Sequence, residues 1–101
     1  MDLPAGSRWR SAVDTTEVIV VRPPTTAVDL ECGGASMVPV TADAPGGAVD
    51  PDHNAGTELG KRYVDDDAGI EVLCTRPGDG SLAVAGRPLV LKEAKPLPSS
   101  D

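Results

Sequence analysis

The stretch that decides the fold is Ile70-Glu71-Val72-Leu73-Cys74, followed by Arg76-Pro77-Gly78-Asp79-Gly80 and Ser81-Leu82-Ala83-Val84. The first segment alternates as a half-buried strand does. The middle segment supplies the proline and glycines of a tight turn, so the third segment is expected to return as a second strand. We therefore predict a β-hairpin over 70–84.

Strands of the same kind are predicted in the first half. Glu17-Val18-Ile19-Val20-Val21 is rich in β-branched residues and ends before Pro23-Pro24, where proline stops a strand. No window of ten residues shows the helical period. The expected fold class is therefore all-β, built from short strands.

Composition and charge limit the classes of binding partner that are expected. The 101 residues include one Trp, one Tyr and no Phe, which excludes an aromatic stacking platform for single-stranded nucleic acid. The net charge is −7 and the longest basic run is Lys61-Arg62, so neither nucleic acid nor an anionic membrane is expected as a partner. Without an apolar span or a leader at Met1–Gly6, the expected compartment is the cytoplasm, where cysteines stay reduced.

Five segments are expected along the chain: a flexible lead at 1–8, a first β unit at 9–40, a linker or long loop at 41–57, a second β unit at 58–91 and an extended tail at 92–101. A shift of about 52 residues aligns the two units without a gap from Arg10 on Arg62, and it places strands and turns in phase. It puts Val18 on Ile70, Val20 on Val72, Leu30 on Leu82 and Met37 on Leu89. The expected core is Val18, Val20, Leu30, Ile70, Val72, Leu82 and Leu89.

A motif with a known spacing runs through the second half. Its members are Tyr63, Gly69, Gly78-Asp79-Gly80, Leu82 and Gly86, with Leu89 at the last position. In this spacing the chain resembles the desulforedoxin-like, rubredoxin-type family, whose pattern is Tyr-x-Cys-x-x-Cys-Gly, a Gly-x-Gly hairpin tip and Leu-x-Cys-Cys-Gly-x-x-Met. The resemblance implies two small ribbon-like β-hairpin units in tandem, a pseudo-dimer within one chain.

The cysteines that define the family are missing. The four ligand positions in the second half hold Asp65, Ala68, Val84 and Ala85, and the first half keeps only Cys32, within Leu30-Glu31-Cys32-Gly33-Gly34. The first knuckle of that half falls at Val13 and Thr16. Since a tetrahedral zinc or iron site needs four nitrogen or sulfur ligands, we expect neither a metal nor another cofactor.

Loss of the metal has a consequence for stability. Structural zinc contributes on the order of 10 kcal/mol to small modules, and a unit of this size is rarely stable alone. We therefore expect the two units to pack face to face and a partner to cover part of the remaining apolar surface. The expected function is that of a non-catalytic accessory or small structural subunit of a larger, enzymatic protein; a homodimer is the other association considered.

Contact residues for this partner are expected in three places. Trp9, between Arg8 and Arg10, is either an interface anchor or a cap on the core of the first unit. The strand with Val18 and Val20 is the second place. The tail, with Lys95 and Leu97, is the third.

Two other functions are kept as alternatives. One is a metal-binding redox or electron-transfer protein that uses Cys32, Cys74 and His53. The other is a small enzyme, which is disfavoured because the chain has one histidine and few aromatic residues to line a pocket.

Overall fold

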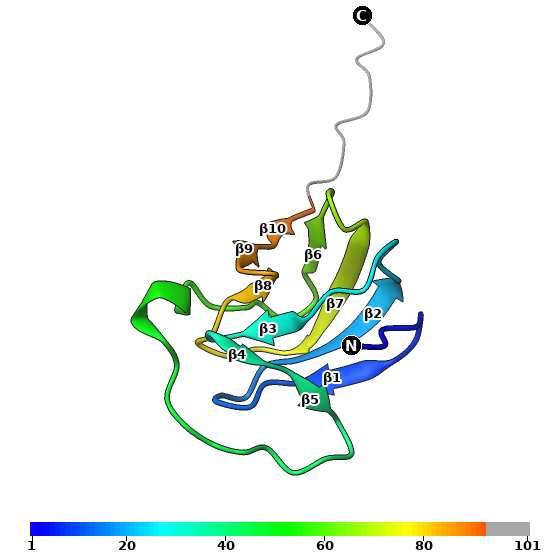
Figure 1. Ribbon diagram of the computed structural model, residues 1–101. Helices are drawn as coiled ribbons and strands as arrows, with labels where there is room; N and C mark the ends of the chain where they lie inside the picture. Colours follow the sequence, from blue (N-terminus) through cyan, green and yellow to red (C-terminus); the bar gives the residue numbers. More distant parts are fainter. Residues whose placement is uncertain (93–101) are drawn as a thin grey trace, which may run out of the picture.

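Ten short strands form two antiparallel sheets in the computed structural model, which describes residues 1–92 (Figure 1). The first half of the chain contributes β1 (Arg8–Arg10), β2 (Glu17–Arg22), β3 (Leu30–Cys32), β4 (Ala35–Ser36) and β5 (Val38–Pro39). The second half contributes β6 (Arg62–Asp65), β7 (Ile70–Arg76), β8 (Leu82–Val84), β9 (Arg87–Pro88) and β10 (Val90–Leu91). The all-β class is therefore confirmed. Within residues 1–92 the only helix is the single 3-10 turn η1 (Pro51–His53), and none is long and apolar enough to cross a bilayer.

Both sheets are built from both halves. The six-stranded sheet has the order β10-β6-β7-β2-β1-β5, and the four-stranded sheet has the order β4-β3-β8-β9. The halves meet at the β2–β7 pair in one sheet and at the β3–β8 pair in the other. They are therefore joined edge to edge by backbone hydrogen bonds, and the expectation of face-to-face packing is wrong.

The core lies between the sheets and belongs to both halves. All seven residues expected there, from Val18 to Leu89, are buried, with exposed fractions of 8% or less. The spacing of two residues between Val18 and Val20 in β2, and between Ile70 and Val72 in β7, explains why these residues are buried together. Every second side chain of a strand points to the same face. The other buried members of the cluster are Leu3, Met37, Tyr63, Ala68, Val84 and the two cysteines.

An approximate twofold symmetry relates the halves. Trp9 pairs with Val18 across β1 and β2, and Tyr63 pairs with Val72 across β6 and β7, so this hairpin repeats at an offset of 54 residues. Later in each half the hydrogen bond from Met37 N to Leu30 O, 2.9 Å, is matched by the one from Leu89 N to Leu82 O, 2.9 Å, an offset of 52.

The ungapped shift of 52 is therefore right for β3 to β5 and two residues out for β1 and β2. Val18 corresponds to Val72 rather than to Ile70. The cause is the connection between the sheets, since Arg22 to Leu30 is two residues longer than Arg76 to Leu82.

The predicted hairpin over 70–84 is wrong. β7 and β8 lie in different sheets, because both edges of β7 are already taken by β2 and β6. The Gly78–Gly80 loop bonds elsewhere: Gly78 exchanges backbone hydrogen bonds with Thr57, and Gly80 N donates to the Asp14 carboxylate. The turn residues Pro77 to Gly80 thus form the connection between the two sheets rather than the tip of a hairpin.

The lead is part of the fold, contrary to expectation. Leu3 is 3% exposed and packs in the core, and Gly6 N donates to Val20 O at 2.8 Å. The loop at 41–57, green in Figure 1, runs round one end and is held by hydrogen bonds from Gly46 N to Ala12 O and from Asp50 N to Gly33 O, both 2.9 Å. Of the expected tail, only Lys92 lies within the described residues.

Candidate functional site

The four residues of the second half that the resemblance aligns with metal ligands have structural roles. Ala68 and Val84 are buried, and Ala85 takes a left-handed conformation with φ of +50°. Asp65 accepts a hydrogen bond from Arg87 at 2.9 Å and one from Ala68 N at 3.0 Å. The bond from Arg87 holds the pKa of Asp65 below its ordinary value. An ion pair, two buried apolar side chains and a left-handed turn residue therefore occupy these four positions.

In the first half the symmetry places the corresponding positions at Ser11 and Asp14, not at Val13 and Thr16. The evidence is a shared turn: Asp14 N donates to Ser11 Oγ at 3.1 Å, as Ala68 N donates to the Asp65 carboxylate. The shift of two residues described above accounts for the difference.

Ser11 and Cys32, which are buried, meet the half-buried Asp14 in a polar cluster. Cys32 Sγ lies 3.9 Å from Asp14 Oδ1, and Asp14 also accepts hydrogen bonds from the Thr16 hydroxyl and from Gly80 N. Burial raises the pKa of Asp14, but these bonds and one involving Ser11 outweigh it, and the pKa lies below its ordinary value. The cluster ties the β1–β2 turn of one half to the Gly78–Gly80 loop of the other.

Neither cysteine is poised for chemistry as a thiolate. Burial and, next, the nearby Asp14 charge raise the pKa of Cys32 to about 11. Cys74 Sγ donates to Arg76 O at 3.1 Å, and burial raises its pKa as well. Within residues 1–92, no three His, Cys, Asp or Glu side chains gather as a metal site, so Cys32, Cys74 and His53 do not form one together.

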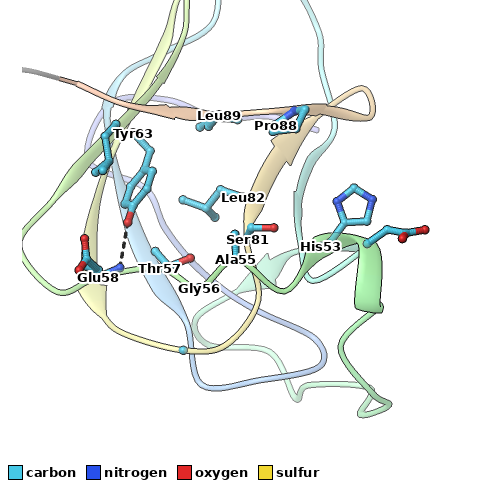
Figure 2. Close-up of a pocket in the computed structure, with 13 residues that line it drawn as sticks. His53, Ala55, Gly56, Thr57, Glu58, Tyr63, Ser81, Leu82, Pro88 and Leu89 are labelled. Carbon is cyan, nitrogen blue, oxygen red and sulfur yellow. Dashed lines mark hydrogen bonds between the residues drawn. The ribbon is translucent and has the colours of Figure 1, made fainter.

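His53 lines an open cleft of about 560 Å³ beside the second half. Figure 2 shows His53 and Tyr63 at opposite ends of this cleft, with Leu82 between them. The Tyr63 hydroxyl accepts a hydrogen bond from Glu58 N at 2.9 Å. Ser81 also lines the cleft, but its only bond with His53 runs through the backbone, and among the described residues no side chain bonds to the imidazole. The cleft therefore offers a concave surface, and among the described residues His53 forms no hydrogen bond with a nucleophilic side chain.

Three of the expected partner contacts lie within the described residues. Trp9 is half-buried against the core, and its Nε1 donates to Ser7 Oγ at 3.0 Å. Val18 and Val20 are each 1% exposed, so their side chains face the core and the expectation that they contact a partner is corrected. Lys95 and Leu97 lie outside the described residues.

The outer face of the six-stranded sheet carries most of the positive charge. Arg8 stands opposite Ile19, Arg10 opposite Glu17, and Arg62 opposite Leu73, and directly opposed residues share a face of the sheet. Ion pairs place the remaining cations on the same face. We call this surface the basic face; its charged members are Arg8, Arg10, Arg22, Arg62, Arg76, Lys92, Glu17 and Glu71.

Glu71 organises one side of the basic face. Its side chain is 2% exposed because three cations cover it, with N–O distances of 3.5 Å to Arg22, 3.3 Å to Arg62 and 2.9 Å to Lys92. The hydrogen bond from Lys92 is the largest favourable cause that holds the pKa of Glu71 below its ordinary value. One carboxylate thus fixes three cations whose side chains remain 43–63% exposed.

The other side of the basic face repeats this arrangement more simply. Glu17 and Arg76 form an ion pair at 3.4 Å, which the twofold symmetry relates to the pair of Glu71 and Arg22. Six of the nine basic residues thus meet two of the sixteen acidic ones, a net formal charge of +4 on a chain of −7. The length of basic runs in the sequence does not reveal this cluster, because its members come from separate strands.

Comparison with known proteins adds no relative. No family model, curated protein or solved structure matches the chain.

Proposed function

We propose that the protein is a non-catalytic accessory subunit that binds a larger protein partner through the basic face. The observation that carries the proposal is the composition of this face. Ile19, Val64 and Leu73 form a half-buried apolar centre, and long cationic side chains surround it. An apolar centre with an arginine-rich surround is typical of a protein-binding surface.

Exposed apolar residues extend this surface. Val21 is 40% exposed at the irregularity in the β2–β7 register, and Val90 is 60% exposed in β10, at the edge of the sheet. At the opposite edge, β5 ends in Pro39, which has no N–H to offer a further strand. A partner that covers the basic face would therefore also bury apolar area towards β10.

We also propose that the chain derives from a desulforedoxin-like metal knuckle that was duplicated and lost its metal. What supports this origin is the first half, where Ser11, Asp14 and Cys32 fall on ligand positions of the family pattern and lie together. The buried free thiols of Cys32 and Cys74 fit a reducing compartment, and we propose the cytoplasm. The metal-binding redox alternative gains no comparable support.

Site-specific crosslinking tests the proposed function. The photo-crosslinking residue p-benzoylphenylalanine replaces Arg8 or Arg62 on the basic face, and Arg87 on β9 of the four-stranded sheet is the matched control position. In the cells of origin, the two face positions should yield one adduct of constant mass, and native mass spectrometry should show a stoichiometric complex. Failure to recover any stoichiometric complex, or adducts formed only from the Arg87 position, would contradict the proposal.

A further inference from the structure

We infer that the partner presents an acidic protein surface to the basic face, an inference that rests on the proposed function. The face carries about +4 while the rest of the chain carries the opposite sign, so the molecule is strongly polarised. Such polarity orients an encounter with a complementary surface and accelerates it.

Four of the six cations are held in place before binding. Arg22, Arg62 and Lys92 share Glu71, and Arg76 is held by Glu17. Within residues 1–92, Arg8 and Arg10 have no acidic partner within ion-pair distance. A partner carboxylate thus meets cations already held by Glu71 and Glu17, and it can form new ion pairs with Arg8 and Arg10. Arginine binds carboxylates through two parallel hydrogen bonds.

The basic face is better suited to a protein than to a nucleic acid. Glu17 and Glu71 lie among the cations and would repel a phosphate backbone, whereas a protein surface can place apolar or basic groups over them. The aromatic residues of β1 and β6, Trp9 and Tyr63, point to the inner face, where they pair with Val18 and Val72. The basic face therefore has no aromatic ring for bases to stack on.

The symmetry of the face adds a geometric expectation. Arg8, Arg22 and Glu17 of one half are related to Arg62, Arg76 and Glu71 of the other. A second copy of this chain cannot use the same face for a twofold dimer, because two surfaces of the same sign repel each other. A partner with acidic groups on both sides of an apolar centre fits the two related sets of cations.

A defined acidic probe tests the inference. Nitrogen-15-labelled protein is titrated with a poly-L-glutamate peptide of about 20 residues, and in parallel with a 20-base-pair DNA duplex and with phosphatidylserine vesicles. Polyglutamate should shift the amide signals of β1, β2, β6 and β7 and bind more tightly than the other two probes. Raising the salt from about 0.05 M to 0.3 M should weaken binding at least tenfold. Tighter binding of DNA or vesicles, or no binding of polyglutamate, would overturn the inference.

Charge variants locate the contact. Arg8→Glu with Arg62→Glu brings the formal charge of the face to about zero and should weaken polyglutamate binding at least tenfold, while circular dichroism stays unchanged. Arg87 belongs to the four-stranded sheet and pairs with Asp65. The Arg87→Gln variant should bind polyglutamate as the wild type does. The inference fails if the double variant binds polyglutamate like the wild type. If the two face positions give adducts but the double variant binds polyglutamate like the wild type, the proposed function stands and the inference fails. If polyglutamate binds but no cellular complex is found, the proposed function alone is refuted.

Discussion

Ile19 of β2 stands directly opposite Leu73 of β7, and the approximate twofold axis of the chain passes between these two residues. The same axis passes between Glu31 and Ala83 in the other sheet. Two halves joined in this way share one core, and each half contributes strands to both sheets. A single core shared by both halves is larger than either unit could bury alone, and this compensates for the absence of a metal-binding cysteine set.

Substituting Glu71 tests the centre of the basic face. Glu71→Gln leaves three cations close together without their carboxylate, and the free energy of unfolding should fall by about 1–2 kcal/mol, less than for a fully buried pair because the cations remain in contact with water. Its symmetry-related control, Glu17→Gln, has a single ion-pair partner and 21% side-chain exposure, so the loss should stay within about 0.5 kcal/mol. Urea unfolding measures both, and equal losses would count against the role given to Glu71.

Ala85 and Gly33 form a second matched pair across the symmetry. Both adopt a left-handed backbone, with φ of +50° at Ala85 and +64° at Gly33. Since this conformation strains any residue with a Cβ atom, Ala85→Gly should raise the free energy of unfolding by about 0.5 kcal/mol. Gly33→Ala should lower it by more than 1 kcal/mol, because its Cβ would also lie 2.8 Å from Val13 Cγ2. Chemical denaturation of both variants checks the opposite signs.

The corner between the sheets leaves no room for a side chain at Gly78. A Cβ atom there would lie 2.3 Å from Thr16 Oγ1 and 2.6 Å from Asp14 Oδ2, so Gly78→Ala should destabilise the protein by about 3 kcal/mol. The control is Gly46→Ala, where φ is +86° and nothing lies within 4 Å, with an expected loss of about 1 kcal/mol. Thermal unfolding should separate the two, and a smaller loss at Gly78 than at Gly46 would show that the loop adapts.

The raised pKa of Cys32 predicts how stability depends on alkaline pH. An unfolded thiol loses its proton near pH 8.5, while the folded state keeps it until about 11. The folded state thus binds more protons in this interval, and its stabilisation, full below about pH 8.5, is lost as the pH rises towards the folded pKa. The free energy of unfolding should therefore fall from about pH 8.5 to 11, and less steeply in Cys32→Ala.

Thiol reactivity provides an independent measurement of the same burial. At about pH 8, a disulfide reagent should label the folded protein slowly and label both cysteines at once after unfolding. Rapid modification of Cys32 in the folded protein would show that the cluster around Asp14 is open to solvent.

The strand content and the core were predictable because they depend on local alternation. Val18 and Val20 lie two residues apart in a β-branched run, as Ile70 and Val72 do, and residues at this spacing face the same side of a strand whichever strands become neighbours. The correct repeat was also within reach. Glu17-Val18 and Arg22-Pro23 match Glu71-Val72 and Arg76-Pro77 at an offset of 54, and a single shift of 52 for the whole unit misses these matches.

Features that depend on which strands become neighbours could not be read from local patterns. The segment from 77 to 80 has the residues of a hairpin turn, yet it passes between sheets because β2 and β6 occupy both edges of β7. The polar cluster of Asp14 with Cys32 and Gly80 joins residues up to 66 positions apart.

By itself, the sequence determined an all-β chain with a duplicated pattern and a thin aliphatic core, since side-chain polarity at period two is enough to choose strands and their inner faces. Only the tertiary structure decided that the two halves complete each other's sheets and that six scattered cations meet on one surface. The physical reason is that strand neighbours are selected by hydrogen bonding and packing over the whole chain, whereas charge counted along the sequence contains no information about which residues will face the same side.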